Sequence, residues 1–190
     1  VVKLPTVNVE TVLTSLIDVS DTLSNYKLVW GAVANASKYN IEIKNTTETY
    51  NYEPTTTEVN LPETYAAGDY AVKLVAVGTT NTDGVGYITS EVTNFNFRKL
   101  GTPKNVTVKN NHLVWAPATG DSPAGYTLEI TYNEETTYVN VGQETSYLFN
   151  PENYKLDMIS VRVRSVGDNA SLVTGEYATT YVLSRAQTIT

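Results

Sequence analysis

The chain has 190 residues, a formal net charge of −7 at pH 7, 41% hydrophobic residues and no cysteine. The hydrophobic content is normal for a folded protein, and the length suits one large domain or two small ones. The acidic charge balance disfavours nucleic acid and anionic membranes as partners. The lack of cysteine excludes disulfide bonds and thiolate metal sites.

Threonine, asparagine and tyrosine are abundant, with 29, 18 and 14 copies respectively. Threonine and tyrosine favour strands, whereas asparagine favours turns. No segment shows a sustained apolar period of about 3.6 residues, so we expect an all-β protein with essentially no helix. No apolar run approaches the roughly 18 residues that a membrane helix needs, and we therefore predict no membrane insertion.

The first twelve residues allow two interpretations. Val7–Val9 followed by Val12 matches Phe95–Phe97 followed by Leu100, at a constant offset of 88 residues. The second set lies where one predicted module ends, so residues 1–12 are either the tail of a preceding module or a linker. Alternatively, Val7–Val9 is the first strand of the first module, followed by a longer loop. The sequence leaves both interpretations open.

The first module is predicted to span residues 13–98. Its main landmark is Tyr26–Trp30, which reads YKLVW. A strand of period two sends Leu28 and Trp30 to the same face, and we expect both in the core. Alternation and intervening turn residues predict the other strands of this module. They are Ile17–Val19, Tyr39–Lys44, Tyr50–Glu53, Thr57–Leu61, Tyr70–Val77 and Ile88–Phe97.

The second module is predicted to span residues 99–185, with residues 186–190 as a C-terminal tail. Its landmark is NHLVW at Asn111–Trp115, where Leu113 and Trp115 lie 85 residues after their counterparts. The same order of strands follows, because the same alternation returns. The predicted strands are Val106–Val108, Leu113–Trp115, Tyr126–Tyr132, Thr137–Val141, Tyr147–Phe149, Ile159–Gly167 and Glu176–Leu183.

Each module carries one acid and one base at corresponding outward positions. Glu42 and Glu129 lie on the third predicted strand, whereas Lys73 and Arg162 lie on the sixth. Opposite charges on facing positions of neighbouring strands attract each other.

The pattern Leu-x-Trp, Tyr-x-Leu/Ile-x-Ile and Tyr-x-Val-x-Leu-x-Ala-Val-Gly resembles the fibronectin type III family over about residues 13–185. The resemblance implies two consecutive seven-stranded Greek-key immunoglobulin-like sandwiches, with Trp30 and Trp115 on the second strand of each. The family's tyrosine of the sixth strand matches Tyr70, but Ile159 stands at this position in the second module. The resemblance therefore implies that the second module lacks this hydroxyl bond and uses Tyr147 or Tyr154 differently. In the family's fold the third and sixth strands are neighbours, so the resemblance also predicts the cross-strand ion pairs Glu42–Lys73 and Glu129–Arg162.

The sequence offers little support for catalysis. The only histidine, His112, has no motif that supplies a nucleophile or a carboxylate partner. Glu134 and Glu135 are expected at a hairpin tip rather than as a catalytic pair of carboxylates. The segment 81–84 lacks the additional acids of a calcium loop and is expected to form a turn. We therefore expect no enzyme, no cofactor and no metal site.

Tyrosines that exceed the needs of two small cores are the candidate binding residues. Tyr132 and Tyr138 flank the Glu134–Glu135 hairpin and are predicted to form an exposed aromatic patch for a ligand. In the alternative interpretation, such tyrosines are cross-strand partners of threonines on a half-exposed sheet. The tyrosines considered are Tyr50, Tyr52, Tyr65, Tyr132, Tyr138, Tyr147 and Tyr154.

The resemblance implies a non-catalytic pair of modules that acts in spacing, presentation or adhesion within a secreted or surface-anchored bacterial protein. Bacterial members of the family often accompany glycoside hydrolase or adhesin domains. The expected partners are neighbouring domains of a longer chain and an extracellular glycan or protein, and we expect a monomer. The alternative hypothesis is a carbohydrate-binding module that uses exposed tyrosines. Fold alone does not decide between these roles.

Overall fold

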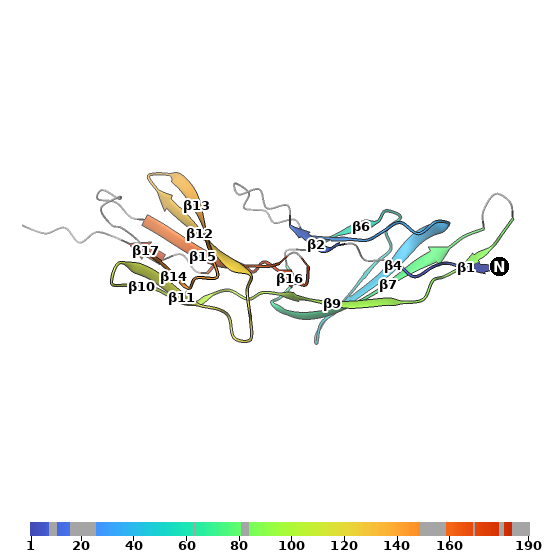
Figure 1. The fold of residues 1–190 in the computed structure, drawn as a ribbon, viewed down its shortest axis with the longest axis horizontal. Helices are drawn as coiled ribbons and strands as arrows, with labels where there is room; N and C mark the ends of the chain where they lie inside the picture. The colour runs from blue at the N-terminus through green and yellow to red at the C-terminus, as the bar shows by residue number, and fades with distance from the viewer. Residues whose placement is uncertain are drawn as a thin grey trace, which may run out of the picture. The chain divides into compact units, whose positions relative to one another are not determined.

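The computed structural model describes residues 1–7, 11–15, 26–62, 64–80, 84–148, 159–168, 170–178 and 181–183. Within these residues the chain consists of strands and connecting segments, without a helix (Figure 1). The chain divides into two compact units. Unit 1 comprises Val1–Lys99 and Asn169–Val173, and unit 2 comprises Leu100–Asp168 and Thr174–Thr190.

The smaller main sheet of unit 1 is antiparallel and has the order β2-β3-β6. Its strands are β2 (Thr11–Ser15), β3 (Tyr26–Val29) and β6 (Glu58–Leu61). The Leu-x-Trp spacing predicts one inward face for Leu28 and Trp30, and each of these residues is only 1% exposed. The predicted core position of the first tryptophan is therefore confirmed.

The larger sheet of unit 1 has the order β16-β9-β7-β4-β5. Its strands are β4 (Ala36–Lys44), β5 (Thr49–Tyr52), β7 (Gly68–Gly78), β9 (Thr93–Lys99) and β16 (Leu172–Val173). All neighbouring pairs are antiparallel except β16 with β9, which run parallel. A separate parallel pair joins β1 (Val2–Lys3) to β8 (Tyr87–Ile88).

The core of unit 1 lies between the three-stranded sheet β2-β3-β6 and the five-stranded sheet β16-β9-β7-β4-β5. Leucine and tryptophan side chains of the smaller sheet meet the alternating apolar residues of β4 and β7. Leu4 and Val7 also belong to this core, with exposed fractions of 4% and 3%. Leu4 and Val7 therefore contribute to the packing of unit 1.

Unit 2 repeats the same layered arrangement. Its three-stranded sheet contains β10 (Lys104–Lys109), β11 (His112–Ala116) and β14 (Ser146–Leu148) in that order. Its four-stranded sheet has the order β13-β12-β15-β17. These strands are β12 (Gly125–Tyr132), β13 (Glu135–Gly142), β15 (Ile159–Val166) and β17 (Tyr181–Leu183). The predicted class of consecutive Greek-key β-sandwiches is confirmed.

The core of unit 2 is separate from that of unit 1 and lies between its own two sheets. Leu113 and Trp115 of β11 are 0% and 6% exposed, as the second Leu-x-Trp repeat predicts. They meet the inward-facing residues of β12 and β15, such as Leu128 and Val161. Each unit therefore buries an apolar core of its own.

Tight turns at asparagine positions join the hairpins of unit 2. Asn133 and Glu134 both have positive φ, 48° and 65°, and Glu135 pairs directly with Tyr132. A two-residue turn with positive φ at both positions matches the right-handed twist of the strands that it joins. Glu134 therefore lies in the turn and Glu135 begins the next strand, which confirms the predicted hairpin.

The two predicted closing strands are wrong in extent. Ile88–Phe97 is interrupted between β8 and β9, because the Ala76 N–H donates to the Ser90 Oγ at 3.0 Å and the Ser90 N–H donates to the Ala76 carbonyl at 2.9 Å. This side-chain bond takes the place of a regular ladder bond. In unit 2, Glu176, Tyr177 and Ala178 lie outside any strand, and the described strand of this segment is Tyr181–Leu183.

Some predicted features lie outside the described residues. These are the strand Ile17–Val19, residues 81–83 of the predicted turn, Phe149 and Tyr154. Three described strands have no counterpart among the predictions. Val2–Lys3 pairs with Tyr87–Ile88, and Thr11–Ser15 pairs with β3 in the smaller sheet of unit 1. Leu172–Val173 joins the sheet of unit 1 by pairing with Arg98 and Lys99.

Candidate functional site

The structure separates the two tyrosines that the sequence suggested as one ligand patch. In the β12–β13 hairpin, Tyr132 lies opposite Glu135, whereas Tyr138 lies opposite Glu129. Tyr132 alternates in phase with Leu128 and packs against the core of unit 2. Tyr138 shares the other face of the sheet with Glu129, because directly opposed residues of two strands point to the same side. The two rings therefore do not form one aromatic platform.

Most of the other candidate tyrosines also pack against a core rather than facing solvent. Tyr65 is only 3% exposed, and Tyr50 and Tyr52 are half-buried against the core of unit 1. Tyr147 packs against the core of unit 2. The expectation of a set of exposed tyrosines is therefore wrong for these four residues. Alternation along β5 directs Tyr50 and Tyr52 to its inner face.

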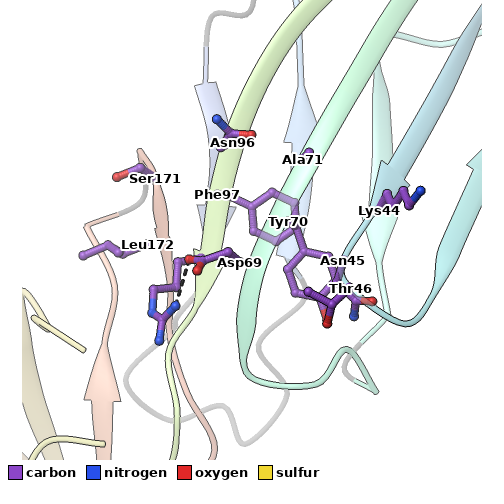
Figure 2. A pocket seen from close by; sticks show the side chains of 11 residues that line it. Lys44, Asn45, Thr46, Asp69, Tyr70, Ala71, Asn96, Phe97, Ser171 and Leu172 are labelled. Carbon is purple, nitrogen blue, oxygen red and sulfur yellow. Dashed lines mark hydrogen bonds and ion pairs between the residues drawn. The ribbon is translucent and has the colours of Figure 1, made fainter. Parts of the chain in front are cut away.

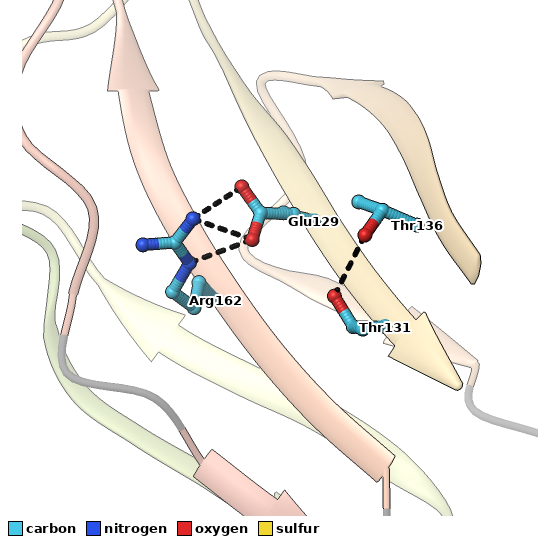
Figure 3. Close-up of polar contacts among 4 residues, drawn as sticks. All are labelled: Glu129, Thr131, Thr136 and Arg162. Carbon is cyan, nitrogen blue, oxygen red and sulfur yellow. Dashed lines mark hydrogen bonds and ion pairs between the residues drawn. The ribbon is translucent and has the colours of Figure 1, made fainter. Parts of the chain in front are cut away.

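The outer face of the four-stranded sheet of unit 2 carries the predicted ion pair. Arg162 of β15 lies directly opposite Glu129 of β12. Its Nε donates to the Glu129 Oε1 at 2.8 Å, and its Nη2 donates to the Oε2 at 2.5 Å (Figure 3). Beside this pair, the hydroxyls of Thr131 and Thr136 lie 3.1 Å apart. The prediction of a cross-strand Glu129–Arg162 pair is confirmed, although Glu129 is covered and only 7% exposed.

Tyr177 provides part of the cover over this face. Its ring lies 4.5 Å from the Arg162 guanidinium carbon and 4.8 Å from that of Arg164. Burial raises the pKa of the Tyr177 phenol, so the ring stays neutral and its π face attracts both cations. Arg164 is only 5% exposed, and its Nε has no hydrogen-bond partner among the described residues. The cation–π contact therefore offsets part of the cost of burying this charge.

A hollow of about 630 Å³ opens on unit 1, where β4, β7 and β9 lie side by side. Lys44, Ala71 and Asn96 form one row across these strands, and the small Ala71 side chain leaves space between its neighbours (Figure 2). Arg98 borders the hollow and its Nη1 donates to the Asp69 Oδ1 at 2.8 Å. The exposed lysine and amide suit contact with a hydroxylated or anionic group, whereas no histidine lines the hollow.

His112 and the acidic residues are the side chains to examine for catalysis or metal binding. The Nδ1 of His112 lies 3.0 Å from the Asn110 carbonyl in the hairpin turn that precedes β11. In the described part of the chain, no three His, Cys, Asp or Glu side chains come together in a way that could hold a metal ion. Among the same residues, no helical segment has the length and apolar character needed to cross a bilayer.

Comparisons with known proteins give structural neighbours only. No protein-family model and no curated protein matches the chain. The chain is similar to the FN1–FN3 domains of chicken CNTN1, with a TM-score of 0.44 and 15% identity over 84% of this chain and 62% of that one. It is also similar to a two-domain fibronectin type III segment of chicken tenascin, with a TM-score of 0.41 and 19% identity over 91% and 97% of the two chains. The strand order of each unit described above indicates a β-sandwich.

Proposed function

We propose that the chain is a pair of non-catalytic β-sandwich modules that spaces or presents other domains, or mediates adhesion, in a secreted or surface-anchored bacterial protein. The observation that carries this proposal is that each unit encloses its own apolar core between two sheets. A self-contained core lets a module fold without help from a ligand or cofactor. Such modules suit a mechanical or presenting role.

The use of charged side chains supports the same proposal. Glu42 and Lys73 form an ion pair of 2.9 Å across β4 and β7, and Glu129 and Arg162 form its counterpart in unit 2. Charges engaged in this way stabilise sheets and fix their register. The partners under this proposal are neighbouring domains of a longer chain and, for the adhesive role, an extracellular glycan or protein. The module pair itself acts as a monomer.

The carbohydrate-binding alternative receives less support from the structure. A sugar platform needs aromatic rings that are exposed on a shared face. Tyr132 packs against the core of unit 2, and Tyr138 lies on the other side of the same hairpin. The pair therefore lacks the geometry on which this alternative depends.

A combined binding and turnover screen tests the proposal. The labelled chain is applied to arrays of glycans and of extracellular proteins, and it is incubated with chromogenic glycosides, esters and peptides. A spacer gives neither saturable binding nor turnover, whereas an adhesive module gives saturable binding without turnover. Turnover that disappears on substitution of a single acidic or hydroxyl side chain would overturn the non-catalytic role. A variant of the hollow, Lys44→Ala, shows whether any observed binding uses that surface.

A further inference from the structure

Four aromatic rings of unit 1 form a continuous stack. The ring centroids of Tyr50 and Tyr65 lie 4.3 Å apart, with an angle of 32° between the planes. Tyr65 and Tyr70 follow at 5.0 Å and 14°, and Tyr70 and Phe97 at 4.9 Å and 8°. The stack begins on the edge strand β5 and ends on β9. Its first two members are the closest pair of rings, and both are phenols.

Each of these two phenols has a hydrogen-bonded group that can take its proton. The Tyr50 hydroxyl donates to the Glu48 Oε2 at 2.5 Å. The Tyr65 hydroxyl lies 2.9 Å from the Tyr52 hydroxyl, and Tyr52 is half-buried and therefore in reach of solvent. The hydrogen bond to Glu48 raises the pKa of Tyr50 to about 12, and burial raises the pKa of Tyr65 further. Both groups are therefore protonated phenols at neutral pH.

A protonated phenol loses an electron easily only when its proton leaves at the same time, because the phenol radical cation is a strong acid. Glu48 receives the Tyr50 proton directly, and Tyr52 relays the Tyr65 proton towards solvent. The Tyr70 hydroxyl, in contrast, donates to the Ala66 carbonyl at 2.8 Å. A carbonyl oxygen is a far weaker base than a carboxylate, so Tyr70 has no comparable proton acceptor. Tyr50 and Tyr65, the two phenols with a hydrogen-bonded proton acceptor, are therefore also the two rings in closest contact.

We propose that Tyr50 and Tyr65 form an oxidative modification site, at which a one-electron oxidant of the peroxidase class joins the two rings as an intramolecular dityrosine. This inference goes beyond the proposed function and does not depend on it. Each phenol loses one electron and one proton, and the two phenoxyl radicals then form a carbon–carbon bond between ring positions ortho to the hydroxyls. Both ring carbons lose their hydrogen as the phenols are restored. The product has two hydrogen atoms fewer, and one hydrogen peroxide is reduced to two waters.

The composition of the chain directs oxidation towards this site. The chain has no cysteine that would intercept the radicals as a thiol. Among the described residues of unit 2, the aromatic ring pair is Trp115 with Tyr126, which cannot give dityrosine. The expected product is therefore a single cross-link in unit 1.

The cross-link would tie an edge strand to a connection between the two sheets. Tyr50 lies on β5, and Tyr65 lies in the segment that leads from β6 to β7. The new bond would close a loop of residues 50–65 and restrict the unfolded chain, as a disulfide does. In a module that transmits force, such a bond would keep the edge strand in place.

The experiment treats the 190-residue chain, in dilute solution, with a peroxidase and hydrogen peroxide. Monomers are isolated, digested with a glutamate-specific protease and analysed by mass spectrometry. Cleavage after Glu53, Glu58 and Glu63 places Tyr50 and Tyr65 on different peptides, so only a covalent bond keeps them together. The expected product is this peptide pair with a loss of two hydrogen atoms, accompanied by dityrosine fluorescence of the monomer.

Matched variants decide whether the proposed geometry is responsible. Tyr50→Phe and Tyr65→Phe should each abolish the product, Glu48→Gln should slow its formation, and Tyr138→Phe in unit 2 should leave it unchanged. Circular dichroism verifies that each variant is folded. The proposal is overturned if the oxidised chain without substitutions yields only intermolecular dimers, no cross-link, or a cross-link between other tyrosines. Undiminished formation in a folded Tyr50→Phe chain would overturn it equally.

Discussion

The two units place their tryptophans in nearly the same way but differ around them. The ring centroids of Trp30 and Tyr39 lie 5.2 Å apart at 69°, and those of Trp115 and Tyr126 lie 5.5 Å apart at 67°. Both are edge-to-face contacts, which suit the opposite charges of ring edge and ring face. The repeated sequence therefore reproduces a packing geometry and not merely a strand. This tryptophan–tyrosine pair is the common element of the two modules.

Away from this pair, unit 1 uses aromatic contacts where unit 2 uses aliphatic ones. Tyr70 stacks between two rings and ties its hydroxyl to the Ala66 carbonyl. Ile159, which stands in its place in unit 2, is 6% exposed and supplies only apolar packing. In immunoglobulin-like sandwiches, a tyrosine hydroxyl bonded in this way to the backbone a few residues upstream holds the segment that precedes the strand. The same sheet position therefore accepts either a stacked, hydrogen-bonded tyrosine or a buried isoleucine, since both fill the core.

The ion pairs of the two units differ in solvent exposure, and the pair of unit 2 is the more buried one. The Lys73 and Glu42 side chains are 59% and 39% exposed, whereas those of Arg162 and Glu129 are 34% and 9% exposed. Tyr177 accounts for part of this cover, since its ring contacts the Arg162 guanidinium. Equivalent positions in the two sequences thus give a solvated pair in one unit and a largely enclosed pair in the other.

The largest expected effect tests the common element. Trp30→Ala and Trp115→Ala should each lower the free energy of unfolding of their own unit by about 3–5 kcal/mol, because both side chains are buried. Such a loss is a large share of the stability of a small domain. Chemical denaturation followed by fluorescence of the remaining tryptophan and by circular dichroism measures it. An unchanged midpoint for either variant would contradict the core position of that tryptophan.

The second prediction compares the two acids. Glu129→Gln should cost about 2 kcal/mol, because it removes the charge that compensates a partly enclosed guanidinium. The cost stays below that of a fully buried pair, since the Arg162 side chain is still 34% exposed. Glu42→Gln is the matched control in unit 1 and should cost clearly less, because its pair is solvated. Equal losses in urea denaturation would show that the enclosure by Tyr177 has no energetic effect.

The third prediction isolates the hydroxyl tie of unit 1. Tyr70→Phe should cost about 1 kcal/mol, because the ring stays in the stack while the Ala66 carbonyl loses its partner. Tyr70→Leu should cost more, since it also removes the two ring contacts. Thermal denaturation of both variants separates the hydroxyl from the ring. If Tyr70→Phe were as stable as the parent chain, unit 1 would resemble unit 2 at this position.

Much of the fold follows from local patterns in the sequence. Alternation from Tyr39 to Lys44 and from Tyr126 to Tyr132 predicts strands that the structure contains. This signal is local, so it does not depend on knowledge of the tertiary fold. The prediction of the two cross-strand pairs needs more, because it combines outward acids and bases with the strand order of the family that the sequence resembles. The inward facing of Tyr132 also follows from its phase with Leu128 along one strand.

Other features depend on contacts between segments that are distant in sequence. Tyr50 stacks on Tyr65 only because β5 contacts the segment between β6 and β7. Neither segment has a sequence pattern that predicts this contact. The pairing of Leu172 with Arg98 is equally non-local. The cover of Tyr177 over Arg162 likewise depends on how the segment before β17 runs beside β15. Burial of such residues is decided by tertiary packing rather than by propensity.

The smallest expected effect is the coupling between Glu42 and Lys73, measured by a double-mutant cycle with Glu42→Gln and Lys73→Met. The hydrogen bond and charge of Lys73 hold the pKa of Glu42 below its usual value. A lowered folded-state pKa means that the stabilisation is complete above the ordinary carboxyl pKa of about 4.3 and is lost as the pH falls through the folded-state value. The coupling should therefore be present at pH 7 and vanish in acid.

Salt sharpens this last comparison between the two units. At 1 M salt the screening length is about 3 Å, so the coupling of the solvated Glu42–Lys73 pair at pH 7 should largely disappear. The enclosed Glu129–Arg162 pair is screened less and should retain most of its coupling under the same conditions. Urea denaturation of the two cycles at low and high salt gives both values. If both couplings fell in parallel, the cover over Glu129 would be as permeable to ions as the open face of unit 1, and the difference in burial between the two pairs would have no electrostatic consequence.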